Sequence, residues 1–301
     1  FENILGGNVK GGVNWNVDAR NNFFANAGYY SKQPLFDAVY INFGNNLNPN
    51  LTNEKITGFE LGYGYRSSKF RANVNLYYTS WKDRFESTGA TFNADQPDEI
   101  RGTANILGIT QVHTGIEFDG RFQASDKFAL TGMMSIGNWE YKDDVTATYF
   151  DNDQAPIVIG GVEQVETLAL DGVKVGDAAQ FTAFLGADYN VVNNLNVDFG
   201  YRFAGNLYAQ FDATSVGPDG ALKLPSFGLA DAGATYSIPF DDKKLSFRVN
   251  VNNLFDTTYI AESDTNIFAQ PGDDTYDGIN TSNRVFFGFG TTWNLSARFN
   301  F

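Results

Sequence analysis

Arginine side chains recur on the polar side of several strongly alternating segments. Arg71, Arg202 and Arg248 each stand among small or polar residues that alternate with apolar neighbours, and Arg298 does so near the C-terminus. Because alternate residues of a strand point to the same face, each guanidinium is expected on a polar face. Guanidinium groups bind carboxylates and phosphates through paired hydrogen bonds, so these arginines are candidates for contact with an anionic ligand. The favoured alternative is that they pair with carboxylates of the surrounding protein.

Aromatic side chains in the predicted loops form a second candidate set. Tyr40, Tyr149 and Phe211 lie in stretches without regular alternation. Aromatic rings in loops can stack on a planar or apolar part of a ligand. For each single ring, packing against other loop residues is the favoured interpretation, and contact with a ligand is the alternative that would give the ring a function.

Carboxylates cluster in the same loops, within residues 95–99, 151–153 and 273–277. Oxygen ligands at this density suit a loop-bound divalent cation such as calcium. The segment 272–278 lacks the alternating ligands and the distal glutamate of an EF-hand loop. The favoured interpretation is therefore solvated charge, neutralised by divalent cations among lipid headgroups, and no cofactor is expected.

Residues for enzymatic chemistry are scarce. The chain has no cysteine and one histidine, His113, so the sequence offers no thiol nucleophile, no disulfide and no paired-histidine metal site. The Gly-Gly pairs at 6–7 and 160–161 are not followed by the Lys-Ser/Thr of a phosphate-binding loop. A net charge of −14 without a basic patch argues against nucleic acid as a partner. The sequence predicts a protein that is not an enzyme.

The elements that position these side chains are long strands that alternate residue by residue. The last segment, 284–301, carries apolar or aromatic residues at one parity and small or polar residues at the other. In a soluble sandwich the apolar face would form the core, whereas in a transmembrane barrel it faces lipid and the polar face lines a wet lumen. About eleven such strands are predicted, at 9–16, 22–32, 54–66, 69–83, 111–124, 128–142, 177–191, 195–209, 226–240, 245–260 and 285–301.

The connections between these strands alternate in length. Short turns are predicted at 17–21, 67–68, 125–127, 192–194 and 241–244, and long loops at 33–53, 84–110, 143–176, 210–225 and 261–284. Short turns at one end and long loops at the other are typical of bacterial outer-membrane barrels. No apolar run approaches the ~18–20 residues of a membrane helix. The predicted fold class is all-β, an antiparallel transmembrane β-barrel.

Three strings resemble TonB-dependent outer-membrane receptors. The first is Tyr29–Phe36 followed by Asn48–Glu54, and the second is Gly58–Tyr63. The third and most specific is Val249–Tyr259, with its Asn-Asn-Leu-Phe-Asp core, and the aromatic C-terminus completes the pattern. The resemblance covers nearly the whole chain.

The resemblance implies a 22-strand barrel around an N-terminal plug. About eleven strands is half of that number, and open sheet edges are not tolerated in hydrocarbon. We therefore expect residues 1–301 to be the C-terminal part of a single barrel domain, with the N-terminal plug and the first barrel strands absent.

The function implied by the resemblance is active uptake of a scarce nutrient, such as a ferric siderophore, across the outer membrane of a Gram-negative bacterium. The implied partners are outer-membrane lipid and lipopolysaccharide, the N-terminal half with its plug, TonB acting through that plug, and the small-molecule nutrient. Two alternatives stay open: a passive porin-like pore, and a barrel that acts as a surface-binding or assembly component of a larger outer-membrane complex. Substrate-contact candidates are Arg71, Arg202, Arg248, Tyr40, Tyr149 and Phe211.

Overall fold

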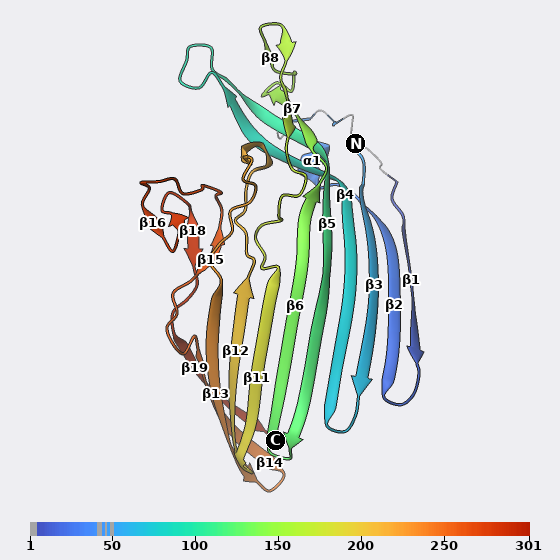
Figure 1. Cartoon of the computed structure of the whole chain (residues 1–301), viewed down its shortest axis with the longest axis vertical. Coiled ribbons are helices and arrows are strands. Elements are labelled where there is room, and N and C mark those ends of the chain that lie inside the picture. The colour runs from blue at the N-terminus through green and yellow to red at the C-terminus, as the bar shows by residue number, and fades with distance from the viewer. Residues whose placement is uncertain (1–4, 41–43, 46, 49–50) are drawn as a thin grey trace.

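A computed structural model describes residues 5–40, 44–45, 47–48 and 51–301. Its main feature is a tall wall of antiparallel strands that are connected by short turns at one end and long loops at the other (Figure 1). We call these the turn end and the loop end. The strands that follow one another across the wall are β1 (Asn8–Asn16), β2 (Asn21–Lys32), β3 (Glu54–Arg66), β4 (Phe70–Phe92), β5 (Ile100–Ser125), β6 (Phe128–Lys142), β11 (Phe181–Val192), β12 (Leu195–Gly205), β13 (Phe227–Phe240), β14 (Lys243–Asn252) and β19 (Thr292–Asn300).

The smaller elements lie at the loop end. Two of them extend the main sheet, because β7 pairs with both β5 and β10. The others form short hairpins, namely β8 with β9, β15 with β18 and β16 with β17. Their bounds are α1 (Phe36–Val39), β7 (Val145–Asp151), β8 (Val158–Ile159), β9 (Val162–Glu163), β10 (Val165–Leu168), the 3₁₀ helix η2 (Ala213–Ser215), β15 (Ile260–Ser263), β16 (Thr275–Tyr276), β17 (Ile279–Asn280) and β18 (Val285–Phe287).

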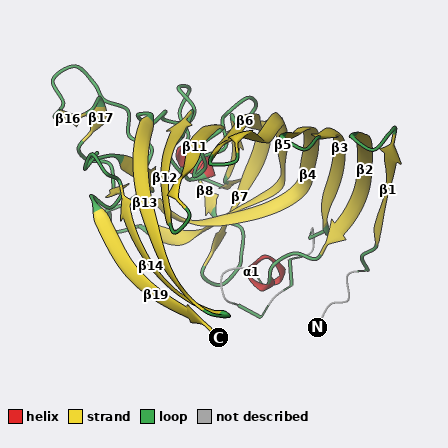
Figure 2. Cartoon of the chain, turned by 90° about the horizontal axis from the view of Figure 1, so that it is seen from below, coloured by secondary structure: helices red, strands yellow, loops and turns green. Residues whose placement is uncertain are grey.

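The wall is curved into an open trough (Figure 2). Within the described residues β1 and β19 are the two end strands, and the sheet does not close by pairing them. Among the same residues, no helix is long and apolar enough to cross a membrane. The structure therefore confirms an all-β antiparallel sheet whose eleven wall strands match the predicted number.

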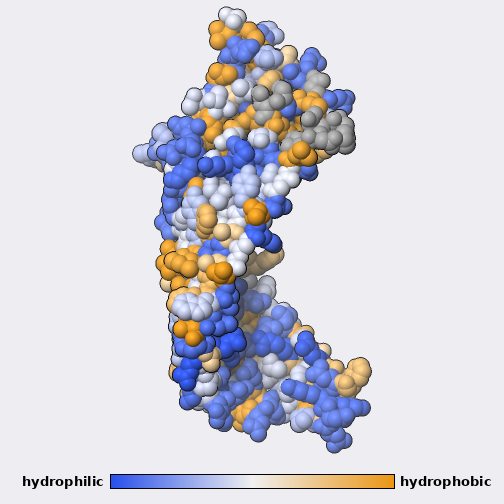
Figure 3. Space-filling model, turned by 90° about the vertical axis from the view of Figure 1, so that its right-hand side faces the viewer, coloured by the Kyte–Doolittle hydropathy of each residue, from blue (hydrophilic) through white to orange (hydrophobic). Residues whose placement is uncertain are grey.

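The register also confirms the predicted alternation of the two faces. Leu76 is the partner of both Leu61 and Ile116, which puts these apolar side chains in one row on the same face. Asn75, one residue earlier, donates a hydrogen bond to Glu117 on the opposite face. The hollow side of the trough is largely hydrophilic, whereas hydrophobic patches gather at mid-height along the opposite edge (Figure 3). The outer face thus suits lipid and the inner face suits water.

Bulky inner-face rings lie over glycines of their own strand and of a neighbouring strand. The Phe184 ring covers Gly186 and Gly200, where an added Cβ would lie 2.8 Å from it in both cases. Such close approach requires glycine at these positions, since any side chain would collide with the ring. The glycines therefore let large rings lie flat along the wall.

Several predicted boundaries are wrong. The segment 84–110 is not a loop, because β4 continues to Phe92 and β5 begins at Ile100, so the hairpin rises far above its neighbours. The strand predicted at 245–260 ends at Asn252, because Asn253 takes a left-handed φ of 48°. The Asn253 side chain accepts a hydrogen bond from the backbone N–H of Thr257 and donates one to the backbone carbonyl of Thr257. The last strand begins at Thr292, because residues 285–287 form β18 and pair with β15 instead.

The fully buried apolar side chains lie at the loop end. Ile106, Ile109 and Leu170 are at most 1% exposed and belong to one cluster that also contains Tyr149. The wall itself exposes its large apolar side chains, including Leu61 and Leu76. The tall β4–β5 hairpin is thus held by a small core of its own, which we call the loop core.

Candidate functional site

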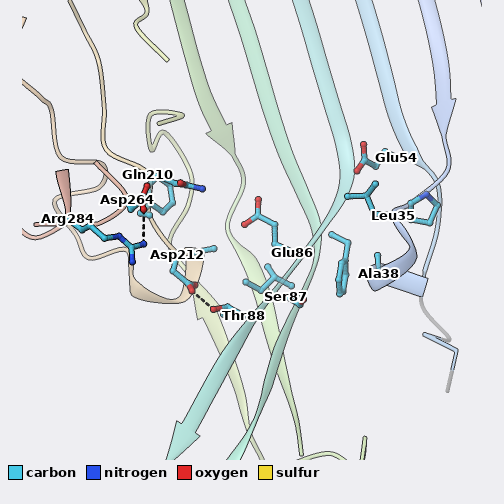
Figure 4. Close-up of a pocket in the computed structure, with 15 residues that line it drawn as sticks. Leu35, Ala38, Glu54, Glu86, Ser87, Thr88, Gln210, Asp212, Asp264 and Arg284 are labelled. Atoms are coloured by element: carbon cyan, nitrogen blue, oxygen red, sulfur yellow. Dashed lines mark hydrogen bonds and ion pairs between the residues drawn. The ribbon is translucent and has the colours of Figure 1, made fainter. Parts of the chain in front are cut away.

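A cavity of about 530 Å³ lies at the loop end of the trough. Segments that are distant in sequence line it (Figure 4). They are the region around α1, the part of β4 from Phe85 to Thr88, the loop from Gln210 to Ala213, and the pair formed by Asp264 and Arg284, together with Glu54 of β3 and Ile106 of β5. The β4 segment reaches the cavity only because β4 continues far beyond its predicted end.

Carboxylates dominate the charged lining of this cavity. Arg284 Nη2 lies 2.8 Å from Asp264 Oδ2, so the one lining guanidinium is already paired. Thr88 Oγ1 donates to Asp212, which also accepts from the backbone N–H of Thr214 at 3.0 Å. These contacts fix the position of Asp212 between β4 and η2.

Glu86 is a half-buried acid of the cavity. Burial raises the pKa of its carboxyl group, Arg84 opposes that shift and Asp212 adds to it. Among the described residues Glu86 has no hydrogen-bond partner, and it points toward the cavity between Asp212 and Leu35 (Figure 4). A ligand that donates a hydrogen bond to Glu86 would satisfy a carboxyl group that the protein leaves free.

The aromatic part of the lining comes from Phe85 and Phe211. The Phe211 ring packs on Tyr141 at a centroid distance of 5.6 Å, which couples the cavity to the top of β6. The cavity therefore offers hydrogen-bond acceptors and apolar ring faces together, the usual composition of a small-molecule site.

The predicted arginines lie on the inner face, and the structure pairs several of them with carboxylates. Arg202 Nη2 lies 3.0 Å from Asp231, and Arg248 Nη1 lies 2.8 Å from Asp198. Arg71 is exposed near the turn end, between its strand partners Arg66 and Arg121. Contact of these arginines with a ligand stays a prediction, and none of them lines the cavity.

The predicted loop aromatics are separated by the fold. Phe211 lines the cavity, whereas Tyr149 is 7% exposed in the loop core, where it donates to Glu166 and packs on Phe92. The pKa of the Tyr149 hydroxyl is raised, mainly because the group is buried. Tyr40 packs on Phe36 at 4.9 Å beside α1. Tyr40 and Tyr149 as ligand contacts stay predictions.

The part of the chain that the structure describes contains no assembled metal site and no assembled catalytic site. No group of three or more His, Asp or Glu side chains there is arranged to hold a metal ion. His113 stacks on Trp139 at 5.3 Å on the inner face, and the Trp139 indole donates to the Tyr77 hydroxyl. This arrangement is an aromatic cluster rather than a catalytic pair.

The sequence did not single out Glu86, Asp212, Asp264 and Arg284. They are single charged residues in stretches predicted as loops, and only the fold brings them together. Arg284 and Asp264 flank the predicted 261–284 loop, so their pairing would follow from a closed hairpin there. Nothing local to Glu86 or Asp212 signals their proximity.

Comparison with known proteins gives consistent matches. A family model described as TonB dependent receptor-like, beta-barrel, matches residues 7–254. An uncharacterized TonB-dependent receptor of Haemophilus influenzae is 26% identical over 213 residues, which cover 71% of this chain and 53% of that protein. The catecholate siderophore receptor Fiu of Escherichia coli K12 is 31% identical over 116 residues, which cover 35% of this chain and 14% of that protein.

Solved structures share the fold of the wall. The Fiu crystal structure matches with a TM-score of 0.59 and 16% identity, covering 96% of this chain and 34% of Fiu. The copper transporter OprC matches with a TM-score of 0.63 and 16% identity, covering 98% of this chain and 39% of that chain. The chain thus spans 53% of the Haemophilus relative and about a third of these solved chains.

Proposed function

The chain belongs to the TonB-dependent receptor-like β-barrel family, and we propose that the whole protein takes up a scarce nutrient such as a ferric siderophore. Membership places the chain in the outer membrane of a Gram-negative bacterium, among transporters rather than enzymes. The long loops then face the exterior and the short turns face the periplasm. A larger barrel, a plug and TonB as the energy-coupling partner are part of the same proposal.

The observation that carries the proposal is the cavity between the external loops. Segments of β4 and of the external loops converge on it, and carboxyl groups and two aromatic rings line it without filling it. A passive pore needs no such convergent lining above its lumen, and an assembly component would present an outward surface instead. The similarity to Fiu, a catecholate siderophore receptor, supports an iron complex as the cargo.

Uptake of radioactive iron tests the proposal. The full gene would be expressed in a strain that lacks its own siderophore receptors, and a panel of ferric siderophores would be supplied one at a time. We expect saturable uptake of at least one complex, lost when the proton gradient is collapsed. Uptake that is linear in concentration and independent of that gradient would favour the passive pore.

A matched pair of variants locates the cargo. Phe211→Ala removes an aromatic face of the cavity, and we expect the concentration for half-maximal uptake to rise about tenfold, a loss of ~1.4 kcal/mol. Phe255→Ala removes a ring that is 71% exposed and does not line the cavity, so uptake should not change. Equal uptake by both variants would place the cargo elsewhere.

A further inference from the structure

Two lysines lie side by side on the lipid-facing side of the wall. Lys55 on β3 and Lys82 on β4 are direct strand partners. They share the parity of Phe59 and Tyr78, which point outward with 52% and 39% exposure. Like charges directly opposite each other across two strands are destabilising. The outer face therefore holds a local excess of positive charge that is unfavourable without an anion.

The protein neutralises only one of these two charges. Lys55 Nζ lies 2.5 Å from Asp83 Oδ2, whereas Lys82 is exposed and forms no ion pair within the described ranges. The next lysines on the same rim differ in this respect. Lys142 and Lys174 both bind Glu140, one to each carboxylate oxygen. The uncompensated positive charge on this part of the rim is therefore that of Lys82, beside the ion pair of Lys55 with Asp83.

The height of the pair matches the headgroup region of the outer leaflet. The outward row directly below contains Tyr29, Thr57 and Ser80, and the row below that contains Phe59 and Tyr78. Tyrosines with one apolar and one polar end concentrate at membrane interfaces. Two residues per row at about 3.4 Å per residue put Lys55 and Lys82 roughly 14 Å above the Phe59–Tyr78 row.

An apolar groove of about 670 Å³ opens on the same face below the lysines. Its floor is made of small residues, Gly11, Ala25 and Ala27, and its side is the ridge of Phe59 and Leu61. The groove spans two successive outward rows across β1 to β4, namely the row of Gly11, Ala27, Phe59 and Tyr78 and the row of Val13, Ala25, Leu61 and Leu76. A hydrocarbon chain in it would contact side chains on the floor and on the ridge.

We propose that Lys55 and Lys82 bind a phosphate group of lipopolysaccharide, and that one of its acyl chains occupies the groove. A phosphate between the two ammonium groups removes their repulsion and supplies the anion that Asp83 alone does not. The site lies at the external ends of the strands, so the lipid it meets is that of the outer leaflet. This lipid site is separate from the cavity and does not depend on which cargo is transported.

Lipid analysis of the purified full-length receptor tests the site. The probe is lipopolysaccharide that copurifies in mild detergent, measured by its hydroxylated acyl chains per receptor. We expect Lys55→Ala/Lys82→Ala to lower this amount about tenfold. Lys32→Ala is the matched control, since Lys32 carries the same charge on the neighbouring strand but pairs with Glu54 on the inner face. The control should retain the lipid.

Two further variants keep the test decisive if the double alanine variant does not fold. Lys55→Arg/Lys82→Arg keeps both charges and should retain the lipid. Ala27→Leu fills the groove floor while leaving both lysines, and should lower the copurified amount. Unchanged lipopolysaccharide in the alanine and leucine variants would overturn the proposal.

Add-back to delipidated receptor distinguishes the sources of phosphate. We expect binding to vesicles that contain lipopolysaccharide, with no competition from millimolar inorganic phosphate. Equal binding to vesicles of phosphatidylglycerol would overturn the assignment to lipopolysaccharide, because an ordinary phospholipid would then satisfy the site. Full competition by inorganic phosphate would overturn the role of the groove.

Discussion

Arg248 on β14 and Asp198 on β12 form a two-point ion pair across the intervening strand β13. Their contacts measure 2.8 Å from Nη1 to Oδ2 and 2.9 Å from Nη2 to Oδ1. The pair passes directly over Gly233, where an added Cβ would lie 2.6 Å from Arg248 Nη2 and 2.7 Å from Asp198 Oδ1. The absence of a side chain on β13 thus lets three strands be joined by one interaction.

Gly233→Ala should separate this pair, because the new methyl group occupies the space between the two charged groups. Both partners are partly exposed, so we expect a modest loss of about 1 kcal/mol in the free energy of unfolding. Refolding titrations of the receptor in lipid vesicles would measure it. Gly58→Ala is the control, since its nearest neighbouring atom would lie 3.9 Å away. Equal losses in both variants would show that the ion pair contributes nothing specific.

Charge on the two faces of the wall should have opposite consequences. Leu76→Arg puts a guanidinium into the hydrocarbon, and we expect a loss of about 2–4 kcal/mol near the bilayer midplane. Asn75→Arg adds the same group one residue earlier, on the wet inner face beside Glu117, and should be tolerated. The same lipid titration measures both variants, and equal losses would contradict the assignment of the two faces.

Acidification should increase the stability of the loop core through protonation of Glu86. Because burial raises the pKa of this carboxyl group in the folded state, the folded protein binds more protons than the unfolded one at pH values between the ordinary 4.5 and the raised value. The stability of this region should therefore increase as the pH falls through that window and level off below it.

Hydrogen exchange around Ile106 and Ile109, corrected for the intrinsic pH dependence, would report this change. Glu86→Gln should remove it, since a neutral amide occupies the same place at every pH. Glu163→Gln, on the exposed β8–β9 hairpin, should leave the profile unchanged. The same pH dependence in Glu86→Gln would assign the effect to another group, such as the neighbouring Asp212.

Residues 1–301 alone should not support uptake if the parent is an energised receptor. The cargo surface would then be shared with other barrel strands, and coupling to the inner membrane would require the plug. Complementation of an uptake-deficient strain, with the full gene and the fragment at matched membrane levels, measures this. Saturable, energy-dependent uptake by the fragment would count against the receptor proposal.

The strands of the wall were predictable because lipid contacts one face and water the other, so apolar and polar residues alternate with a period of two. The strand predicted at 128–142 matches β6, and that at 54–66 matches β3, since each is bounded by a polar turn or loop and alternates throughout. The upper part of β4 carries no such pattern. With the lipid headgroups at the level of Lys82, as proposed above, the segment beyond Lys82 has water on both sides, so apolar and polar residues no longer need to alternate.

The Asn-Asn-Leu-Phe-Asp string resembles a motif of TonB-dependent receptors, and the structure gives it a physical role. Asn253 ends β14 by folding its side chain onto the backbone of Thr257 and by bonding the carbonyl of Phe289 at 3.1 Å. The cavity was not predictable in the same way. Glu86 and Asp212 are 126 positions apart, and their proximity depends on how far β4 rises and where η2 packs against it.

The loop core gives the receptor two regions whose stability depends differently on temperature. Burial of Ile106, Ile109 and Leu170 away from water carries the heat-capacity change of ordinary globular folding, so this stabilisation weakens on cooling. While the barrel stays in the membrane, the lipid-facing side chains of the wall remain in an apolar medium, so local opening of the loop core exposes apolar surface to water whereas local opening of the wall does not. In a bacterium growing in the cold we therefore expect the loop core to open before the membrane-embedded wall.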